Sequence, residues 1–232
     1  MSAQRLSPFI VGVAGPSACG KTTFCRALRD ALGAASCLLI SHDDYYRDLG
    51  QLSLQERERH NFDTPDALQT DLLVEHLERL RSGAAVYKPL YDFTRHRRRE
   101  QGETVSPAAA IVVEGILVLA CPELRGVCDL RVYMDTPADI CLARRVLRDV
   151  GERGRSVQFC IDQYLRTVRP MQQEWVLPSA RYAQVVVTAE DDTDSVRRVL
   201  ELIAERAGRD HGGLVSDTQA SEAQTPGAAG DG

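Results

Sequence analysis

Lysine is almost missing from this 232-residue chain: Lys21 and Lys88 are the only two, and all other members of the 28 lysines and arginines are arginines. Because arginine is the default basic residue here, a cluster of arginines says little about function. A lysine that remains indicates a position where a compact ammonium is needed and a flat guanidinium does not fit.

Metal-type cysteine spacings and long apolar runs are missing as well. The seven cysteines are an odd number without a Cys-x-x-Cys pair, which excludes the usual zinc spacings and a disulfide scaffold. The longest apolar stretch, residues 107–121, is too short to cross a bilayer and contains Glu114. Residues 1–15 make a poor signal peptide, because a single arginine precedes a short apolar run. We therefore expect reduced thiols and a cytoplasmic protein.

An excess of positive charge is also absent. The 33 acidic residues outnumber the 28 basic ones, and the net charge of −5 excludes a protein-wide field for nucleic acid or an anionic membrane. With 26% charged and 44% hydrophobic residues, the composition is that of a globular protein rather than a disordered, collagen-like or coiled-coil chain. The expected partners are small molecules, and any anion site must be local.

Short apolar runs alternate with segments of helical period, which is typical of an α/β fold with a parallel sheet. The expected strands are residues 9–14, 37–41, 109–113, 130–134 and 184–187, and the expected helices are 21–32, 66–81, 136–150, 156–168 and 193–207. A β-hairpin insertion is expected over about 85–106, and an irregular insertion between the second strand and residue 66. Residues 1–207 are predicted to form one domain, and the polar residues 208–232 a disordered tail.

A phosphate-binding loop is the clearest motif. Gly15-Pro-Ser-Ala-Cys-Gly-Lys-Thr22 matches G-x-x-x-x-G-K-[ST] and lies between an expected strand and an expected helix. The residues expected to contact phosphates are Gly15, Pro16, Ser17, Ala18, Cys19, Gly20, Lys21, Thr22 and Thr23. Lys21 would reach the β and γ phosphates, and the Thr22 hydroxyl would bind Mg²⁺. The motif predicts a doubly wound fold of the P-loop NTPase type.

Acidic residues follow two of the expected strands. Asp43 and Asp44 come directly after the second strand, and Glu114 ends the run Ile111-Val112-Val113. Ligands of doubly wound sheets collect at the carboxyl ends of the strands. Either aspartate can supply a general base and Glu114 a metal ligand for phosphoryl transfer, although an acid after a strand is as often a turn or a helix cap. The chain has no N-K-x-D motif and no D-x-x-G near Glu114, which argues against a GTPase.

Longer strings then resemble the uridine/cytidine kinase group of P-loop kinases, from about residue 10 to residue 187. Besides the phosphate loop, the strings are Ser41-His-Asp-Asp-Tyr-Tyr46, Asn61-Phe-Asp-Thr-Pro-Asp66, Pro89-Leu-Tyr-Asp-Phe-Thr-Arg-His96, Val113-Glu-Gly-Ile-Leu117 and Arg144-Arg-Val-Leu-Arg-Asp-Val-Gly-Glu-Arg-Gly-Arg155. The phosphate loop and Glu-Gly are shared with nicotinamide riboside kinase, phosphoribulokinase and pantothenate kinase. The other strings are more selective.

This resemblance implies phosphorylation of the 5′-hydroxyl of uridine and cytidine for pyrimidine salvage, with Mg²⁺ and with ATP, or GTP, as donor. It also implies a cytoplasmic homotetramer. Asp43 matches the catalytic base and lies near the metal, which Thr22 and Glu114 would also bind. Lys21 and Arg148 match residues that stabilise the transferring phosphoryl group.

The nucleoside side of the site is likewise implied by the resemblance. Asp63 matches the residue that binds the ribose diol, so we expect 2′-deoxyribose to be rejected. Arg145 matches a sugar and phosphate contact. Tyr91 and His96 match the residues that read the pyrimidine edge, and one imidazole can serve uracil or cytosine. The remaining matched nucleoside contacts are Tyr46, Phe62, Phe93 and Gln163. Without the resemblance, core packing for Tyr91 and Phe93 and a solvated turn for His96 are the simpler interpretations.

The arginine-rich segment predicts a lid. Gly151 and Gly154 would hinge a lid over about 151–170, and Arg153 and Arg155 on it would contact phosphates together with Arg148. A solvated arginine face is the alternative. Asp44 departs from the pattern of the uridine/cytidine kinase group, whose members usually have a small or neutral residue at this position. A P-loop nucleotide sensor without catalysis is the rival hypothesis from a different functional class.

Overall fold

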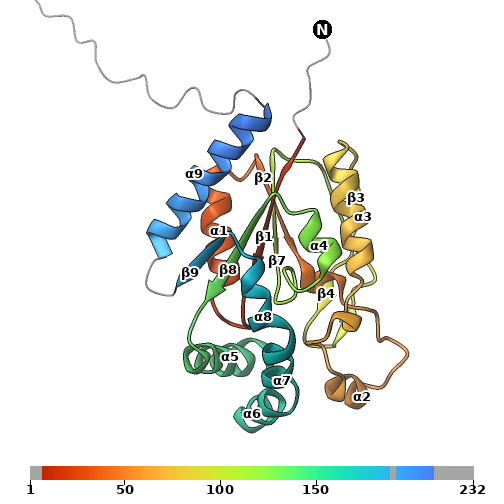
Figure 1. The fold of residues 1–232 in the computed structure, drawn as a ribbon. Helices are drawn as coiled ribbons and strands as arrows, with labels where there is room; N and C mark the ends of the chain where they lie inside the picture. Colours follow the sequence, from red (N-terminus) through yellow and green to blue (C-terminus); the bar gives the residue numbers. More distant parts are fainter. Residues whose placement is uncertain (1–6, 189–191, 212–232) are drawn as a thin grey trace, which may run out of the picture.

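The protein is described by a computed structural model that places residues 7–188 and 192–211 (Figure 1). Within these residues one five-stranded sheet forms, with every neighbouring pair of strands parallel. In spatial order its strands are β2 (Cys37–Ser41), β7 (Ala110–Glu114), β1 (Phe9–Ala14), β8 (Leu130–Asp135) and β9 (Val185–Thr188). The α/β fold with a parallel sheet is therefore confirmed. Strands β2 and β7 lie on one side of β1, and β8 and β9 lie on the other, so the crevice at the carboxyl end of β1 is the switch point where ligands bind in such sheets.

Alternating side chains of the central strand face two separate cores. Ile10 of β1 belongs to the cluster that includes the leucines of α3 (Thr70–Arg81). Val11 and Val13 belong to a second cluster with Phe24 and Leu28 of α1 (Lys21–Leu32) and with α9 (Asp192–His211). Because β1 is buried along its whole length, both faces of the sheet are covered (Figure 1).

The helix expected at 66–81 begins later than predicted. A short 3₁₀ turn, η2 (Pro65–Ala67), is followed by Leu68 in an extended conformation, and Leu68 forms a β-bridge with Tyr46. A residue that pairs as a strand cannot also start a helix, so α3 begins at Thr70. The preceding insertion contains two elements that the sequence did not predict, η1 (His42–Tyr45) and α2 (Leu54–Arg59), and Ser53 and Glu56 form a capping box at the start of α2.

The hairpin insertion is two short ladders instead of one. Strand β3 (Val86–Lys88) pairs with β6 (Glu103–Val105), and β4 (Tyr91–Asp92) pairs with β5 (Arg97–Arg98), both antiparallel. Pro89 lies between β3 and β4, and a proline has no N–H to continue a ladder. After β7, the short helix α4 (Pro122–Gly126), also not predicted, packs against α3.

The segment expected to be a lid is longer than predicted. Helix α5 (Ala138–Arg153) includes Gly151, so only Gly154, with a left-handed φ of 67°, breaks the chain. A continuous helical arm then follows from Val157 to Tyr182; in Figure 1 it begins at the lower end of the molecule and rises toward the sheet, where α8 is labelled. Its consecutive parts are α6 (Val157–Gln163), η3 (Tyr164–Val168), α7 (Arg169–Met171), η4 (Gln172–Val176), α8 (Leu177–Ser179) and η5 (Ala180–Tyr182). The predicted hinge at Gly151 is wrong, because this glycine lies inside a helix.

The last helix also extends past its expected end. Helix α9 ends at His211, so the predicted tail boundary at residue 208 falls four residues too early. The rest of that predicted tail, 212–232, lies outside the described residues. All seven cysteines lie within them and are buried and free. None of the described helices combines the length and the apolar character needed to cross a membrane.

Gly12 tests how tightly β1 is packed. A Cβ at this position would lie 2.6 Å from Cys128 Sγ and 3.1 Å from Val118 Cγ1. We expect Gly12→Ala to destabilise the fold by about 2 kcal/mol and to lower the melting temperature by about 4–8 °C. Adding Cys128→Ala removes the nearer atom and should recover part of the loss in thermal denaturation. Equal melting temperatures for wild type and Gly12→Ala would contradict this packing.

Candidate functional site

The phosphate loop is held in a conformation that few residues adopt. Gly20 has a φ of 108°, which is left-handed and favours glycine, and Ala18 has a φ of 63°. A Cβ on Gly15 would come within 2.6 Å of the Met134 carbonyl oxygen. The loop therefore rests directly on the end of β8, and helix α1 begins at Lys21 with its amino end directed at the loop.

Lys21 is buried and its ammonium is bound by the loop itself. Its Nζ donates to the carbonyl oxygens of Gly15, at 3.0 Å, and Pro16, at 2.8 Å. Burial works against the charged form, but attraction by Cys19, Glu114 and Asp43 outweighs it, so the pKa of Lys21 is raised. Lys21 is therefore a fixed positive charge inside the loop.

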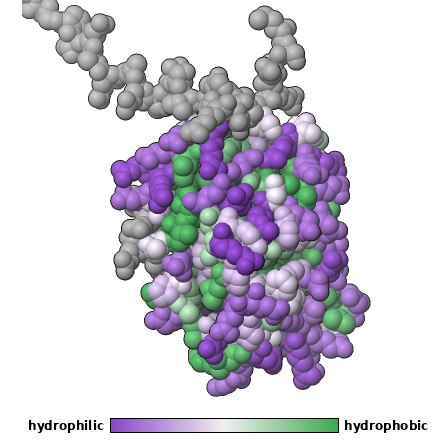
Figure 2. Space-filling model, in the orientation of Figure 1, coloured by the Kyte–Doolittle hydropathy of each residue, from purple (hydrophilic) through white to green (hydrophobic). Residues whose placement is uncertain are grey.

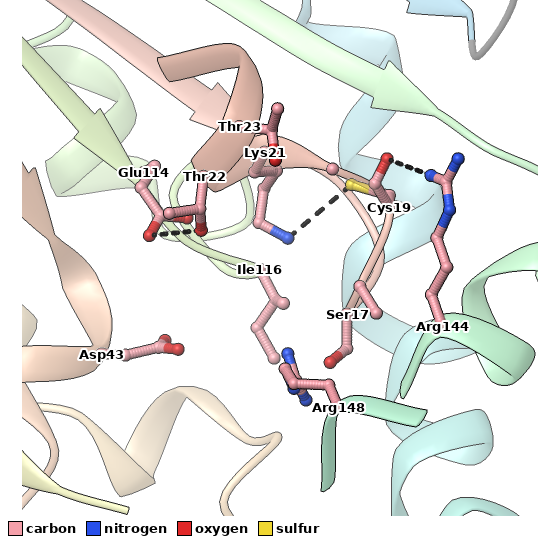
Figure 3. A pocket seen from close by; sticks show the side chains of 12 residues that line it. Ser17, Cys19, Lys21, Thr22, Thr23, Asp43, Glu114, Ile116, Arg144 and Arg148 are labelled. Atoms are coloured by element: carbon pink, nitrogen blue, oxygen red, sulfur yellow. Dashed lines mark hydrogen bonds between the residues drawn. The ribbon is translucent and has the colours of Figure 1, made fainter. Parts of the chain in front are cut away.

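Side chains with oxygen atoms that can bind a metal ion lie close together at the carboxyl ends of β2 and β7. Glu114 Oε1 accepts from Thr22 Oγ1 at 3.4 Å and from Ser41 Oγ at 3.3 Å (Figure 3 draws the Thr22 bond). Hydroxyl and carboxylate oxygens suit Mg²⁺, which usually keeps water and phosphate oxygens as its other ligands. Among residues 7–188 and 192–211, no group of three histidine, cysteine or acidic side chains forms a complete protein cage for a metal. This donor set fits a metal that arrives with a phosphate-bearing ligand.

Asp43 faces these groups from the end of β2. It lies in η1, and its backbone N–H donates to Ser41 Oγ. Its Oδ1 atom has no solvent contact and no hydrogen-bond partner in the described part of the chain. Desolvation, together with repulsion by Glu114, raises the pKa of Asp43 to about 7, while Lys21 and Arg153 oppose the shift. Asp43 is therefore a carboxylate with an unused acceptor and a pKa near neutrality.

A cavity of about 380 Å³ opens above the phosphate loop (Figure 3). Its lining consists of Ser17, Ala18, Cys19, Gly20, Lys21, Thr22, Thr23, Asp43, Glu114, Ile116, Arg144 and Arg148. No motif in the sequence indicated a role for Arg144 or Ile116. Arg144 Nη1 donates to the carbonyl oxygen of Cys19 at 3.5 Å. In the sequence, only the position of Arg144 next to Arg145 could have indicated that Arg144 lines the cavity.

A second cavity adjoins the first. Its lining consists of Ser17, Asp43, Tyr46, Phe62, Asp63, Tyr91, Phe93, His96, Ile116, Arg145, Arg148, Arg153, Arg155 and Gln163. All eight residues predicted to contact a nucleoside are in this set. Asp43 and Arg148 line both cavities, so they lie at the junction between them.

Asp149 organises the arginines around the second cavity. This fully buried carboxylate lies 2.9 Å from Arg148 Nη2, 3.2 Å from Arg153 Nη1 and 3.6 Å from Arg145 Nε. Burial raises the pKa of Asp149, but the three guanidinium groups outweigh that effect and lower it. The sequence analysis assigned it no role, because an acid on an arginine-rich helix also fits a solvated face.

Arg145 links the phosphate loop to the helical arm. It donates to Ser17 Oγ at 2.9 Å and to Gln163 Oε1 at 3.0 Å. The buried Asp63 lines the same cavity; desolvation raises the pKa of its carboxyl, although Arg145 opposes the shift. Arg145, Asp63 and Gln163 therefore form one charged wall.

The end of α5 and the link that joins it to the helical arm touch the hairpin insertion across the second cavity. Arg155 Nη2 donates to His96 Nε2, and the Arg153 guanidinium lies 4.7 Å from the centre of the Phe93 ring. His96 stacks on Phe62 at 4.9 Å. Arg153 and Arg155 were predicted to contact ATP phosphates, but the structure places both at the second cavity and neither in the lining of the first. Of the residues predicted to contact phosphates, Arg153 and Arg155 therefore lie away from the cavity at the phosphate loop.

Because burial raises the pKa of Asp43, the stability of the folded protein should depend on pH. In the folded protein the pKa of Asp43 is about 7, above the 3.8 of an exposed aspartate, so between these values the folded state binds more protons and stability falls as pH rises. We expect Asp43→Asn to raise the melting temperature of the ligand-free protein by about 5 °C at pH 8. The gain should shrink as the pH falls from 7 toward 4. The exposed Asp66→Asn is the control, and a gain that grows on acidification would refute the assignment.

Comparisons with known proteins agree with this geometry. The sequence pattern of the phosphoribulokinase/uridine kinase family matches residues 10–195. The chain is 48% identical over 183 residues to a uridine kinase from Chloroflexus aggregans, covering 79% of this chain and 88% of that protein. It is 43% identical over 187 residues to a uridine kinase from Ligilactobacillus salivarius, covering 81% and 88%.

Solved structures share the fold at lower identity. A phosphoribulokinase from Rhodobacter spheroides superposes with a TM-score of 0.58 at 13% identity, over 78% of this chain and 70% of that one. A D-glycerate 3-kinase from Cryptococcus neoformans gives 0.54 at 16% identity, over 73% and 79%. These structures support the P-loop kinase fold, and the sequence match decides the family. The chain belongs to the phosphoribulokinase/uridine kinase family.

Proposed function

We propose that the protein transfers the γ-phosphoryl group of ATP to the 5′-hydroxyl of uridine and cytidine. The observation that carries this proposal is the position of Asp43 and Arg148 at the junction of two adjoining cavities. One cavity has the elements of a triphosphate site, and the other has a buried acid, aromatic rings and arginines. The relatives named uridine kinase support a nucleoside as acceptor.

On the donor side, the residues present suit a triphosphate with Mg²⁺. Lys21 supplies a fixed positive charge in the loop, and the loop amides and the amino end of α1 favour phosphate oxygens. Thr22, Glu114 and Asp43 are the residues that would hold the metal. When bound, Mg²⁺ neutralises charge that develops on the phosphate oxygens.

Asp43 is the proposed general base. Its free Oδ1 atom can accept the proton of a hydroxyl that lies in the second cavity. A pKa of about 7 suits a base that works near neutral pH. Arg148 lies at the same junction and would stabilise negative charge on the phosphoryl group during transfer.

On the acceptor side, Asp63 and Arg145 are the proposed ribose contacts. Ribose hydroxyls would give the buried Asp63 carboxylate hydrogen-bond donors, so an acceptor without the 2′-hydroxyl leaves one oxygen unpaired. Tyr91 and His96 are the proposed base contacts. The pKa of His96 is lowered to about 4 by burial and by Arg155, Arg153 and Arg57, so the ring is neutral. Since its Nε2 accepts from Arg155, its Nδ1 carries the proton.

Movement of the end of α5, the link around Gly154 and the start of the helical arm is the proposed lid motion. The second cavity measures about 70 Å³, which is well below the roughly 300–1,000 Å³ of typical small-molecule sites. The Arg155–His96 and Arg153–Phe93 contacts close it, and Gly154 provides a break between α5 and the arm. Nucleoside binding therefore requires these contacts to open, after which Arg153 and Arg155 can reach the phosphoryl group or the base.

A homo-oligomer in the cytoplasm completes the proposal. Ile140, Leu147 and Val150 lie on one face of α5, and Leu147 is 75% exposed. Figure 2 shows apolar surface, in green, at the lower end of the molecule near this helix. An apolar stripe of this kind suits contact with a second copy of the chain. Light scattering of the purified protein measures the oligomeric state.

An acceptor panel tests the proposed activity. ATP turnover should occur with uridine and cytidine and be at least ~100-fold lower in kcat/KM with deoxycytidine, because Asp63 would lose a partner. Nicotinamide riboside, ribulose 5-phosphate and pantothenate should give little turnover in the same coupled assay. Turnover confined to one of these three would replace the proposed acceptor. ATP binding without any turnover would instead favour a nucleotide sensor.

Asp43→Asn tests the proposed base. We expect kcat with uridine to fall at least ~100-fold, because the amide cannot take the proton, while the Kd for ATP changes little. Calorimetry measures the Kd, and the exposed Asp66→Asn serves as the control with wild-type kcat. If Asp43→Asn retained wild-type kcat, another group would have to be the base.

A further inference from the structure

Lys88 is a buried charge that the proposed chemistry does not use. Of the two lysines in the chain, Lys21 belongs to the phosphate loop, whereas Lys88 ends β3 in the hairpin insertion. Its side chain is only 6% exposed, and it lines neither cavity of the site. A buried ammonium is costly unless it is paired, so its partners indicate what it does.

The main partner of Lys88 is Asp44, the neighbour of the proposed base. Lys88 Nζ lies 2.8 Å from Asp44 Oδ2 and 3.4 Å from Glu103 Oε2 on β6. The Asp44 side chain is 18% exposed, whereas the Glu103 side chain is 56% exposed. Coulombic attraction is stronger where water is excluded, so the Asp44 contact is the stronger of the two.

The second carboxylate oxygen of Asp44 binds the next strand of the insertion. Asp44 Oδ1 accepts from the backbone N–H of Tyr91 at 3.3 Å. One carboxylate therefore contacts β3 through Lys88 and β4 through Tyr91. These two strands belong to separate ladders, with Pro89 and Leu90 between them. Asp44 bridges the break that the proline creates.

Other contacts also connect the η1 region to the hairpin insertion, but they do not reach both β3 and the start of β4 as the Asp44 carboxylate does. Arg98 donates to the carbonyl oxygens of Tyr45, at 3.2 Å, and Tyr46, at 2.8 Å, and the rings of Tyr46 and Tyr91 lie 5.1 Å apart. The Arg98 contacts reach β5, and the ring contact is apolar and not directional. Within the described residues, the Asp44 contacts are the charged ones that connect η1 to both β3 and the start of β4.

We propose that Asp44 and Lys88 form a clamp that positions the base-contacting wall of the nucleoside cavity relative to Asp43. The clamp consists of the Asp44 carboxylate, the Lys88 ammonium and the Tyr91 backbone N–H. Asp43 and Asp44 are adjacent in η1, so the clamp sets the distance between the proposed base and Tyr91. Asp44 and Lys88 are positioning residues, and this inference rests on the proposed function.

The clamp predicts an effect on one substrate and not on the other. Asp44→Asn and Lys88→Met each remove one charge, and each should raise the KM for uridine about tenfold, as expected for coupled side chains. The KM for ATP should change less than about twofold, because neither residue lines the first cavity. Glu103→Gln is the matched control; it removes a charge from the exposed partner of the same lysine and should leave both constants near wild type.

The double variant separates a clamp from general destabilisation. Asp44→Asn with Lys88→Met leaves no unpaired buried charge, so it should fold even where a single variant does not. Its KM for uridine should be close to that of the single variants rather than the product of their effects. A product of the two effects, an equal rise in the KM for ATP, or a wild-type KM for uridine in Lys88→Met would each overturn the clamp.

Hydrogen–deuterium exchange tests the clamp without substrate. In ligand-free Asp44→Asn, peptides covering residues 86–105 should exchange faster than in wild type, and in Glu103→Gln they should not. Unchanged exchange would overturn the clamp. If wild type phosphorylates no nucleoside yet the exchange result is as expected, the proposed function fails and the clamp remains.

Discussion

The register of three parallel strands is the constraint on which the site depends. Glu114 of β7 pairs with Ser41 of β2 on one side and with Val13 of β1 on the other. This register brings the Glu114 carboxylate to Thr22 and Ser41, beside the phosphate loop that follows β1. A slip of one residue would turn the Glu114 side chain to the opposite face of the sheet. Both faces are covered by apolar helices, so the buried side chains on the two faces hold the register in place.

Two carboxylates near the site, Asp149 and Asp43, differ in how well their charges are stabilised. Asp149 is surrounded by three guanidinium groups, and their attraction more than offsets the cost of its burial. Asp43 has one oxygen without a partner and remains a strained charge near Glu114. Three guanidinium groups stabilise the charge of Asp149, which holds the arginines in place, whereas desolvation and Glu114 destabilise the charge of Asp43, which suits a group that accepts a proton. This contrast supports the proposed roles of the two acids better than their spacing in the sequence does.

The acceptor side is built from two insertions rather than from the sheet. The hairpin contributes Tyr91 and His96. The helical arm contributes Gln163, and the link before the arm contributes Arg155, which contacts His96 across the second cavity. The proposed chemistry therefore joins a donor site at the end of the sheet to an acceptor site formed largely by two insertions. A charged link between η1 and the hairpin is one way to keep the two in register.

Local pattern in the sequence determined the α/β class, the phosphate loop, the strand-end acids and, through resemblance, the residues that gather at the second cavity. These features depend on periodicity and short spacings, which tertiary contacts do not change. Only the tertiary structure decided that the hairpin is two ladders and that Arg153 and Arg155 line the second cavity. It also decided that Lys88 is bound to Asp44 and that Arg145 contacts both the phosphate loop and the helical arm. Such pairings join residues far apart in the chain, as Arg145 joins Ser17 across 128 positions. They depend on how the separate elements pack together, which no local pattern specifies.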